Sequence, residues 1–466
     1  MTRAMRLRKI ALLSVSAALL SGCLSVGQPP PLNNADVPAA FEQMASNDAP
    51  IWPSPDWWHG FQSPELDGLI ATAQAGNLSL AAAEARVVQA DARVRQAGAS
   101  LLPTVGLSAD ASHSFTPNFS NVGLSLGASY EVDLWNRNRN ALAATVASGN
   151  ATRADRETVA LTATAGVANT YFQLLSLRDR LAIAHLNLDT ALSVLMVTES
   201  RVRNGIATPL ELAQQRAAIA GQQAQIPALE QQELQTRAAL AVLLGRPPEG
   251  FDVTGKEVES LALPEIAPGI PSQLLARRPD VATAEANLYA AHADIAVARA
   301  ALFPSISLTG SGGLQSTGLT ELVTNPINSF SLGASLVQTV FDAGRLQAVT
   351  DEARAREQEL LANYRNTAIT AFSEVETTLG SIGNLAEQEM YLADQVMQSE
   401  TAFDIANARY REGVADYLTV LDAQRTLYGA RDSLSQVRLQ RLLAVVALYK
   451  ALGGGWQNPT PVFANG

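Results

Sequence analysis

The chain has 466 residues and a formal net charge of −11 at neutral pH; 17% of its residues are charged and 6% are aromatic. This length is enough for a large core or several domains, and the acidic balance argues against a nucleic-acid partner, which would favour a basic stripe. The spacing of the four histidines suits no metal site, and the sequence holds no nucleotide-binding loop, serine-hydrolase elbow or zinc-peptidase motif. These patterns argue against an enzyme and predict no cofactor.

The N-terminus has the pattern of a signal peptide. Basic residues precede an apolar run, Ile10–Leu20, that is too short for an ordinary transmembrane helix. The run leads into Ser21-Gly22-Cys23, which resembles the bacterial lipoprotein signal; that resemblance implies a lipid on Cys23. Leu24 follows, rather than aspartate, and by the same analogy the protein goes to the outer membrane. The alternative is a chance cysteine in a discarded leader.

The chain repeats itself. The pentapeptide SLGAS occurs at Ser125–Ser129 and again 206 positions later, at Ser331–Ser335. Farther along, Arg201–Gly205 matches Arg409–Gly413 at an offset of 208. The offset between the two copies changes little over more than a hundred residues. The repeat is far longer than the unit of a solenoid protein. We therefore interpret the chain as a tandem duplication.

Each half begins with an Ala-rich helix, Leu78–Ser100 and Pro279–Leu302, ended by a proline. Two strands follow. Even positions from 122 to 134 are apolar, and odd positions are small or polar. This alternation fits either a soluble sheet with one buried face or the strands of a membrane barrel, which need roughly 9–11 residues. The location in the outer membrane, predicted from the N-terminal signal, favours the barrel.

Four strands cannot close a barrel, and open edges in lipid would leave backbone groups unsatisfied. Three chains would supply twelve strands, an even number within the range of such barrels. Long helical hairpins follow the strands, with outward helices of about 65 residues, roughly 100 Å long. The hairpins turn at a glycine; the predicted helices are 138–203, 208–244, 345–411 and 417–452.

These features together resemble the TolC-like outer-membrane efflux proteins, in their lipoprotein, NodT-type branch. The chain departs from the family at Asn136, where the family often has glycine. The stretches that carry the resemblance are Tyr130–Trp135, Arg277–Val281, Phe341–Leu346, Arg409–Gly413 and Leu421–Arg425.

The resemblance implies a mainly α protein with a β membrane portion: a long α-helical coiled-coil barrel, and four β-strands per chain contributing to a 12-stranded trimeric transmembrane β-barrel. The expected domains are a signal peptide (1–22), a lipid-anchored lead (23–63), a first repeat (64–244, barrel strands about 103–134, hairpin about 138–244), a Pro-rich equatorial connector (245–271), a second repeat (272–452, barrel strands about 304–341, hairpin about 345–452) and a tail (453–466).

The resemblance also implies a function: the outer-membrane channel of a tripartite efflux pump that conducts small molecules such as drugs and toxic compounds. Its expected partners are two further copies of the chain, a periplasmic adaptor, an inner-membrane pump of the RND type and outer-membrane lipid. One alternative is the outer-membrane channel of a type I protein secretion system. An alternative of another class is a poreless periplasmic coiled-coil lipoprotein.

In this family the second-half hairpin closes the periplasmic end of the tunnel. By alignment the closing ring comprises Tyr410, Asp416, Leu418, Thr419 and Asp422. Three copies of Asp422 around an axis would repel anions and attract cations. Some members of the family have a second acid where this chain has Thr419, so the ring is weaker here or shifted to Asp416. Asp416 also suits the N-cap of the following helix, and the two roles are compatible.

The two hairpin turns are the predicted adaptor-docking tips. The resemblance assigns this role to residues of both breaks, and the alternative is a plain helix–helix turn. The tip residues are Asn204, Gly205 and Thr208 in the first repeat and Glu412 and Gly413 in the second.

Overall fold

The computed structural model describes residues 37–38, 40–42, 51–255, 257–264 and 271–458. Cys23, the predicted lipidation site, lies outside the described residues. The chain divides into two compact units. One, the strand unit, holds residues 85–154 and 282–367; the other, the hairpin unit, holds the described residues of 34–84, 155–281 and 368–458. Each unit is described by itself.

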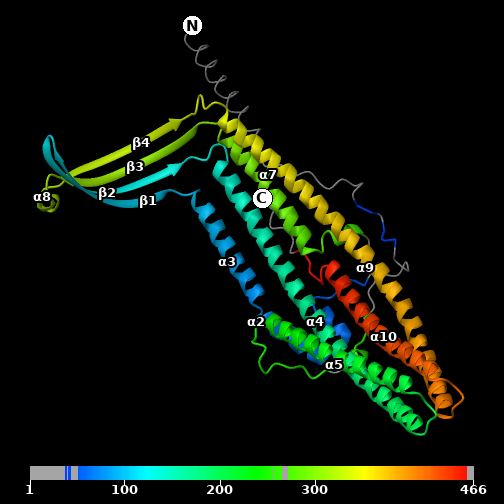
Figure 1. Cartoon of the computed structure of the whole chain (residues 1–466). Helices are drawn as coiled ribbons and strands as arrows, with labels where there is room; N and C mark the ends of the chain where they lie inside the picture. Colours follow the sequence, from blue (N-terminus) through cyan, green and yellow to red (C-terminus); the bar gives the residue numbers. More distant parts are fainter. Residues whose placement is uncertain (1–36, 39, 43–50, 256, 265–270, 459–466) are drawn as a thin grey trace. The chain divides into compact units, whose positions relative to one another are not determined.

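The strand unit contains one antiparallel sheet with the order β1-β2-β3-β4 (Figure 1). Its strands are β1 (Thr104–Phe115), β2 (Asn118–Glu131), β3 (Ser305–Ser316) and β4 (Ile327–Val337). A short helix, α8 (Leu319–Thr324), joins the last two strands and was not predicted.

The register of the sheet places apolar side chains on one face and small polar ones on the other. Leu107 pairs with Leu126 across β1 and β2, and Leu126 pairs with Gly312 of β3. On the opposite face the hydroxyl oxygens of Ser108 and Ser125 lie 2.8 Å apart. Thr104–Ser129 and Ser311–Ser331 form the same kind of pair. The alternation seen in the sequence is therefore a true two-faced sheet.

One sequence interpretation was wrong. The glycines of Gly310–Gly313 suggest a loop between strands, yet they lie inside β3. A Cβ atom at residue 313 would come within 2.7 Å of the backbone oxygen of Leu124, so the strands approach too closely for a side chain there. Gly310 and Gly312 face Leu332 and Phe330 of β4. Glycine in a strand marks this close approach rather than a turn.

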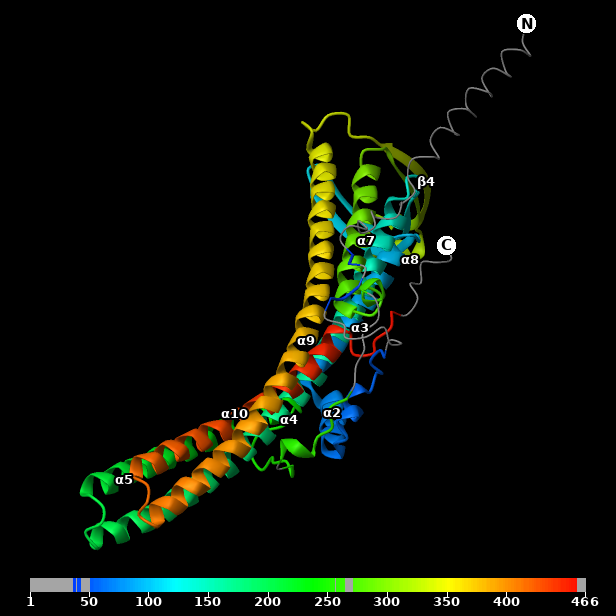
Figure 2. The same ribbon diagram turned by 90° about the vertical axis from the view of Figure 1, so that its right-hand side faces the viewer.

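Helices of equal length occur in the two repeats. The long helices α4 (Arg137–Arg203) and α9 (Arg345–Arg411) have 67 residues each. Their return helices α5 (Pro209–Leu243) and α10 (Tyr417–Ala451) have 35 residues each. Figure 2 shows the turns of both hairpins at the same end of the hairpin unit. The shorter helices α3 (Leu78–Ala99) and α7 (Pro279–Ala300) precede the strands of each repeat.

The hairpin unit has an aromatic core at the end opposite to its turns. The ring of Trp57 stacks on that of Tyr449 at 4.8 Å, and Phe61 and Phe172 are fully buried beside them. Trp57 and Phe61 belong to a 3-10 helix, η2 (Trp57–Phe61), which leads into an unpredicted helix, α2 (Pro64–Gly76). The last residues of the expected lead, 57–63, therefore pack into the body of the protein.

A proline lies inside α5. Pro227 has no backbone N–H, so the helix lacks one hydrogen bond in its interior. The helix nevertheless continues to Leu243, because residues on both sides of the proline, such as Ile219 and Leu240, are buried.

Among the described residues, α4 alone has a stretch long and apolar enough to cross a membrane by length and composition, and 28% of that stretch is buried. Core helices have similar stretches, so this feature assigns no span.

Candidate functional site: the paired hairpin tips

The two hairpin turns have the same backbone structure. Gly205 and Gly413 adopt positive φ angles of 72° and 80°. In each turn the residue after the glycine donates its N–H to a carbonyl in the last turn of the helix: Ile206 to Arg201 and Val414 to Arg409, both at 2.9 Å. A glycine in the left-handed region followed by this bond is a common helix C-terminus. The duplication therefore extends to the geometry of the tips.

Side chains begin the return helices. The Thr208 hydroxyl accepts the N–H of Glu211 at 3.3 Å, and the Glu211 carboxylate accepts the N–H of Thr208 in return. At the second tip, the Asp416 carboxylate accepts the hydroxyl and the N–H of Thr419 at 2.7 and 2.8 Å. The bond from the Thr419 hydroxyl has the larger effect and the bond from the Thr419 N–H the smaller one, and together they hold the pKa of Asp416 below its usual value. Asp416 is thus a helix cap, the role that sequence analysis weighed beside the gate.

The predicted docking residues all lie on the surface of the tips. The side-chain amide and the backbone N–H of Asn204 both donate to the Ser200 carbonyl, at 2.8 and 3.2 Å. Beside them, Ile206 is 63% exposed and Val414 is 67% exposed. Ile206 and Val414 therefore present apolar side chains to their surroundings at equivalent positions of the two repeats.

The structure does not bring the five predicted gate residues together. Asp416, Leu418, Thr419 and Asp422 are exposed, and Leu418 and Asp422 share one face of α10. Tyr410, in contrast, is only 1% exposed. It is buried where the second hairpin packs on the first, with its ring edge-on to that of Tyr417 at 6.0 Å.

Tyr410 joins the two hairpins. Its hydroxyl donates to the Glu211 carboxylate of α5 at 3.2 Å, and burial raises the pKa of Tyr410. Glu211 is not among the predicted site residues. Its match to the capping-box pattern Thr208-x-x-Glu211 could have placed this carboxylate at the tip, but nothing in the sequence pairs it with Tyr410.

Further polar contacts join the hairpins along their helices, away from the turns. None of these contacts is predicted from the sequence. The buried Gln215 of α5 accepts from the Tyr417 hydroxyl at 2.7 Å and donates to the Ala191 carbonyl of α4 at 2.6 Å. The Tyr428 hydroxyl of α10 donates to the Asn187 carbonyl of α4 at 2.6 Å. Because buried polar groups need partners, these bonds fix the alignment of the hairpins along their axes.

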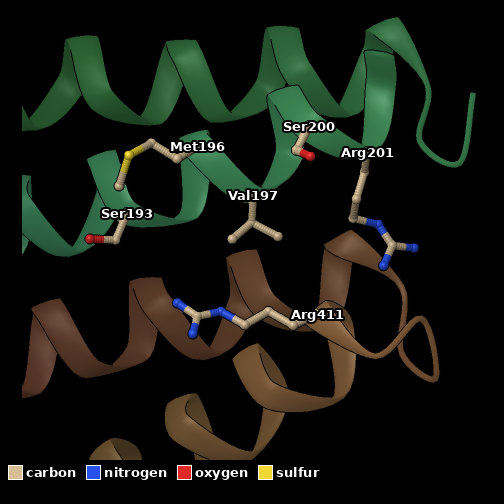
Figure 3. A pocket seen from close by; sticks show the side chains of 6 residues that line it. All are labelled: Ser193, Met196, Val197, Ser200, Arg201 and Arg411. Carbon is tan, nitrogen blue, oxygen red and sulfur yellow. The ribbon is translucent and has the colours of Figure 1, made fainter. Parts of the chain in front are cut away.

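A shallow pocket of about 450 Å³ lies between the ends of α4 and α9. Figure 3 shows Ser193, Met196, Val197, Ser200 and Arg201 on the α4 side and Arg411 on the α9 side. Its lining combines two serines, two apolar side chains and two arginines. It lies next to the predicted docking residues, on the same hairpin pair.

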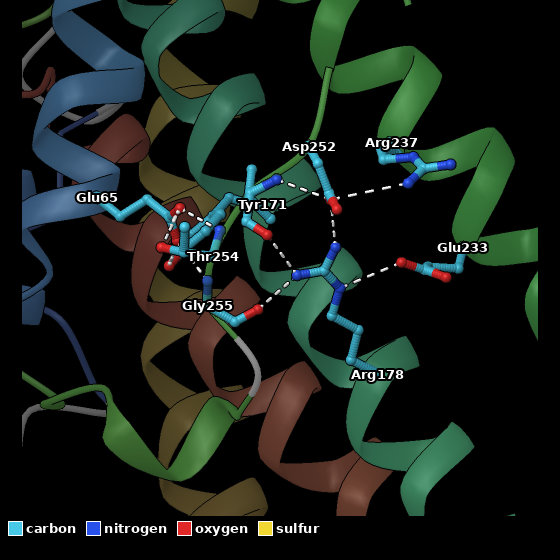
Figure 4. A network of polar contacts seen from close by, with 9 residues as sticks. Glu65, Tyr171, Arg178, Glu233, Arg237, Asp252, Thr254 and Gly255 are labelled. Atoms are coloured by element: carbon cyan, nitrogen blue, oxygen red, sulfur yellow. Dashed lines mark hydrogen bonds and ion pairs between the residues drawn. The ribbon is translucent and has the colours of Figure 1, made fainter. Parts of the chain in front are cut away.

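The connector between the repeats is fastened to α4 by Arg178. Figure 4 shows the Arg178 guanidinium between the connector and α5. It donates to the carbonyls of Val253 and Gly255, both at 2.7 Å, and contacts the carboxylates of Asp252 at 2.5 Å and Glu233 at 3.1 Å. One planar guanidinium can make all these bonds at once.

A second fastening comes from Glu65 of α2. Its carboxylate accepts the hydroxyl of Thr254 and the N–H of Gly255, both at 2.8 Å, and the Tyr171 hydroxyl at 2.9 Å. Burial opposes ionisation of Glu65, but the bonds from Thr254 and Gly255 outweigh it and lower the pKa. These contacts hold residues 252–255 of the connector against α2 and α4.

Within the described ranges, no group of three or more His, Cys, Asp or Glu side chains is placed to hold a metal ion.

The sequence model of the outer membrane efflux protein family matches residues 69–246 and again 270–454, once per repeat. The chain belongs to the outer membrane efflux protein family. It is 42% identical to the pyoverdine export outer membrane protein OpmQ of Pseudomonas putida over 97% of this chain and 99% of the relative. It is 31% identical to the toluene efflux pump outer membrane protein TtgC of the same species, over 96% of each chain.

Solved structures give the same result. The outer-membrane channel OprN superposes with a TM-score of 0.86 at 30% identity, covering 93% of this chain and all of OprN. The open state of the Neisseria gonorrhoeae outer membrane channel MtrE superposes with a TM-score of 0.83 at 30% identity, covering 92% and 97%. The predicted family, fold class, efflux function and outer-membrane location are thereby confirmed. The relatives are channels rather than enzymes, which favours the non-enzymatic interpretation.

Proposed function

We propose that three copies of this efflux protein form one tunnel, with a twelve-stranded barrel in the outer membrane and the hairpins in the periplasm. The observation that carries the proposal is the sheet. Its apolar face is open in the single chain: Leu107, Phe330 and Leu332 are 70–78% exposed. Edge strands β1 and β4 each pair on one side only within the described residues. Lipid would cover the apolar face, and neighbouring copies would pair the edges.

The cargo that we propose is a small molecule. The more similar relatives are named for pyoverdine export, and others for toluene or antibiotic efflux. These names favour small-molecule efflux over the type I secretion of polypeptides, and the likeness to channels disfavours a poreless coiled-coil lipoprotein. We infer no cofactor, because conduction through a tunnel needs none.

The partners that we propose are a periplasmic adaptor, which docks on the tips, and an inner-membrane pump of the RND type. The exposed Ile206 and Val414, each beside a rigid glycine turn, suit the apolar side chains of an adaptor. Asp422 and Asp416 remain our candidates for a carboxylate ring around the threefold axis of the proposed trimer, where it would close the tunnel. A lipid on Cys23 would anchor the chain, and Cys23→Ser should abolish incorporation of radiolabelled palmitate.

Dye efflux in cells tests the proposal. The chain is expressed with a cognate adaptor and pump in a bacterium lacking its own efflux channel, and the accumulation of a fluorescent dye is measured. We expect less dye with the wild-type chain than with a variant in which residues 304–341, the second strand pair, are deleted. Equal accumulation, with the wild-type chain present in the outer membrane as a trimer, would refute small-molecule efflux. Secretion of a co-expressed polypeptide would then support the type I alternative.

A further inference from the structure

Arg201 joins the two hairpin tips through two kinds of contact with one residue. It lies in the last turn of α4, and its guanidinium carbon is 4.5 Å from the centre of the Tyr410 ring of α9. One terminal nitrogen of the same guanidinium donates to the backbone carbonyl of Tyr410. A planar guanidinium can stack and donate at once, whereas a lysine ammonium cannot stack in this way.

The carbonyl that Arg201 contacts belongs to the end of a helix. The last carbonyls of a helix have no partner within it, and the helix C-terminus attracts positive charge. The Tyr410 carbonyl already accepts the N–H of Gly413 at 3.0 Å, and Arg201 takes up its remaining capacity. A side chain of the first hairpin therefore caps the long helix of the second.

Three contacts from the first hairpin hold Tyr410. Arg201 covers its ring and takes its carbonyl, and Glu211 of α5 accepts its hydroxyl. Glu211 is itself held by the capping box with Thr208. We propose that Arg201 is a positioning residue of the tip: it orients Tyr410 toward Glu211 and so favours the closed pairing of the two hairpins. This inference rests on the proposed tunnel and its closure at the tips.

One donor of the Arg201 guanidinium is unsatisfied in the contact with Tyr410. The Nε atom of Arg201 is buried and has no hydrogen-bond acceptor among the described residues. Burying an unsatisfied donor is unfavourable, and separation of the hairpins would return it to water. The Arg201 contacts therefore oppose opening less than a fully satisfied guanidinium would.

The duplication supplies a matched control. Arg409 occupies the equivalent place in α9, and its backbone carbonyl accepts the N–H of Val414 just as that of Arg201 accepts the N–H of Ile206. The side chain of Arg409 is exposed, and the described part of the chain gives it no ion pair or hydrogen bond. Arg409→Ala removes the same charge from the same kind of turn but leaves the contacts with Tyr410 intact.

The test compares full-length trimers of wild type, Arg201→Ala, Arg201→Lys, Arg409→Ala, Tyr410→Phe and the double variant Arg201→Ala/Tyr410→Phe in planar bilayers. We expect the open probability to rise about tenfold in Arg201→Ala, to rise in Arg201→Lys as well, and to stay at the wild-type value in Arg409→Ala. Tyr410→Phe should add little in the Arg201→Ala background, because the hydroxyl is then no longer oriented. An unchanged Arg201→Ala, or an equal rise in Arg409→Ala, would overturn the proposal.

Hydrogen exchange of residues 409–417 separates this inference from the proposed function. The amides of this turn should exchange faster than in wild type in Arg201→Ala and at the wild-type rate in Arg409→Ala, whether or not the protein conducts. If no variant conducts, faster exchange in Arg201→Ala alone keeps the positioning role and rejects the tunnel. Equal exchange in both variants rejects the positioning role. Arg201→Lys takes the place of Arg201→Ala if the latter does not form trimers.

Discussion

Glu211 shows how one side chain can belong to two structures. One carboxylate oxygen closes the capping box of α5, and the other accepts the Tyr410 hydroxyl of the opposite hairpin. The cap fixes the carboxylate in place, so little side-chain entropy is lost when Tyr410 binds. Local helix formation thus prepares the contact that joins the hairpins.

Tyr410→Phe tests the value of that contact. The substitution keeps the ring under Arg201 and removes only the hydroxyl, so we expect the free energy of unfolding to fall by about 1–2 kcal/mol. Denaturant unfolding measures the change. Tyr391→Phe is the control, because Tyr391 is 62% exposed on the same helix. An equal loss in both variants would show that the bond with Glu211 contributes nothing specific.

Asp179 of α4 predicts a pH dependence. Its carboxylate accepts the N–H of Val258 at 3.0 Å, and burial raises its pKa to about 6. The folded chain therefore holds this proton up to a higher pH than the unfolded chain. The stability that Asp179 contributes is present below the unfolded pKa and is lost as pH rises toward 6.

Asp179→Asn removes this titration and keeps an acceptor for Val258. A shift of this size in a closed interior would correspond to about 3 kcal/mol, and partial exposure to solvent reduces it to about 1 kcal/mol. We expect the variant to be more stable than wild type above pH 6 and to lose the advantage below pH 4. Thermal unfolding across this range measures it, and a constant difference would contradict the assignment.

Among the helices and strands, the hairpins were predicted well, because glycines and helix-capping residues mark their turns in the sequence. Glycine at the turn and a capping residue after it define the tips, and the structure places α9 at the predicted residues 345–411. The elements that were missed lack such signals or contradict them. The glycines of β3 resemble a loop, and only the neighbouring strands explain them. Residues 57–63 looked like part of the lead, and only the core formed with Tyr449 gives them a place.

The contacts between hairpins could not be predicted. Tyr410 was assigned to the gate through the family resemblance, but its burial against Glu211 depends on how the two hairpins pack. Sequence periodicity gives the face of one helix and not the facing residue of another.

Pro227 makes α5 differ from its repeat partner α10, which has Ser435 at the equivalent position. Pro227→Ala restores an N–H to the helix interior, and we expect a gain of about 1 kcal/mol in the free energy of unfolding. If Pro227→Ala destabilises the trimer, then packing requires the proline and the missing bond is not a weakness.

The connector gives a second prediction at this scale. Arg178→Ala leaves two backbone carbonyls without their donor, so we expect a loss of about 3 kcal/mol and faster proteolysis between 245 and 271. Arg237→Ala is the control, because Arg237 only approaches Asp252, at 3.8 Å. Proteolysis at the wild-type rate in Arg178→Ala would show that Glu65 alone fastens the connector.

In the whole molecule, the sheet and the hairpins present different surfaces. The sheet has an apolar face and open edges that suit lipid and further copies, whereas the hairpins end in glycine turns with exposed apolar side chains. We propose a tunnel that is closed near the hairpin tips and conducts when the tips separate.

Conductance of the purified full-length trimer in a planar bilayer tests this claim most directly. Wild type is compared with Asp422→Ala, and with Asp404→Ala as the control for loss of an exposed acid elsewhere on the hairpin. We predict a small, cation-selective conductance that rises in Asp422→Ala and is unchanged in Asp404→Ala. A conductance that Asp422→Ala leaves unchanged would contradict the carboxylate ring, and folded trimers that conduct in none of the three proteins would contradict the tunnel itself.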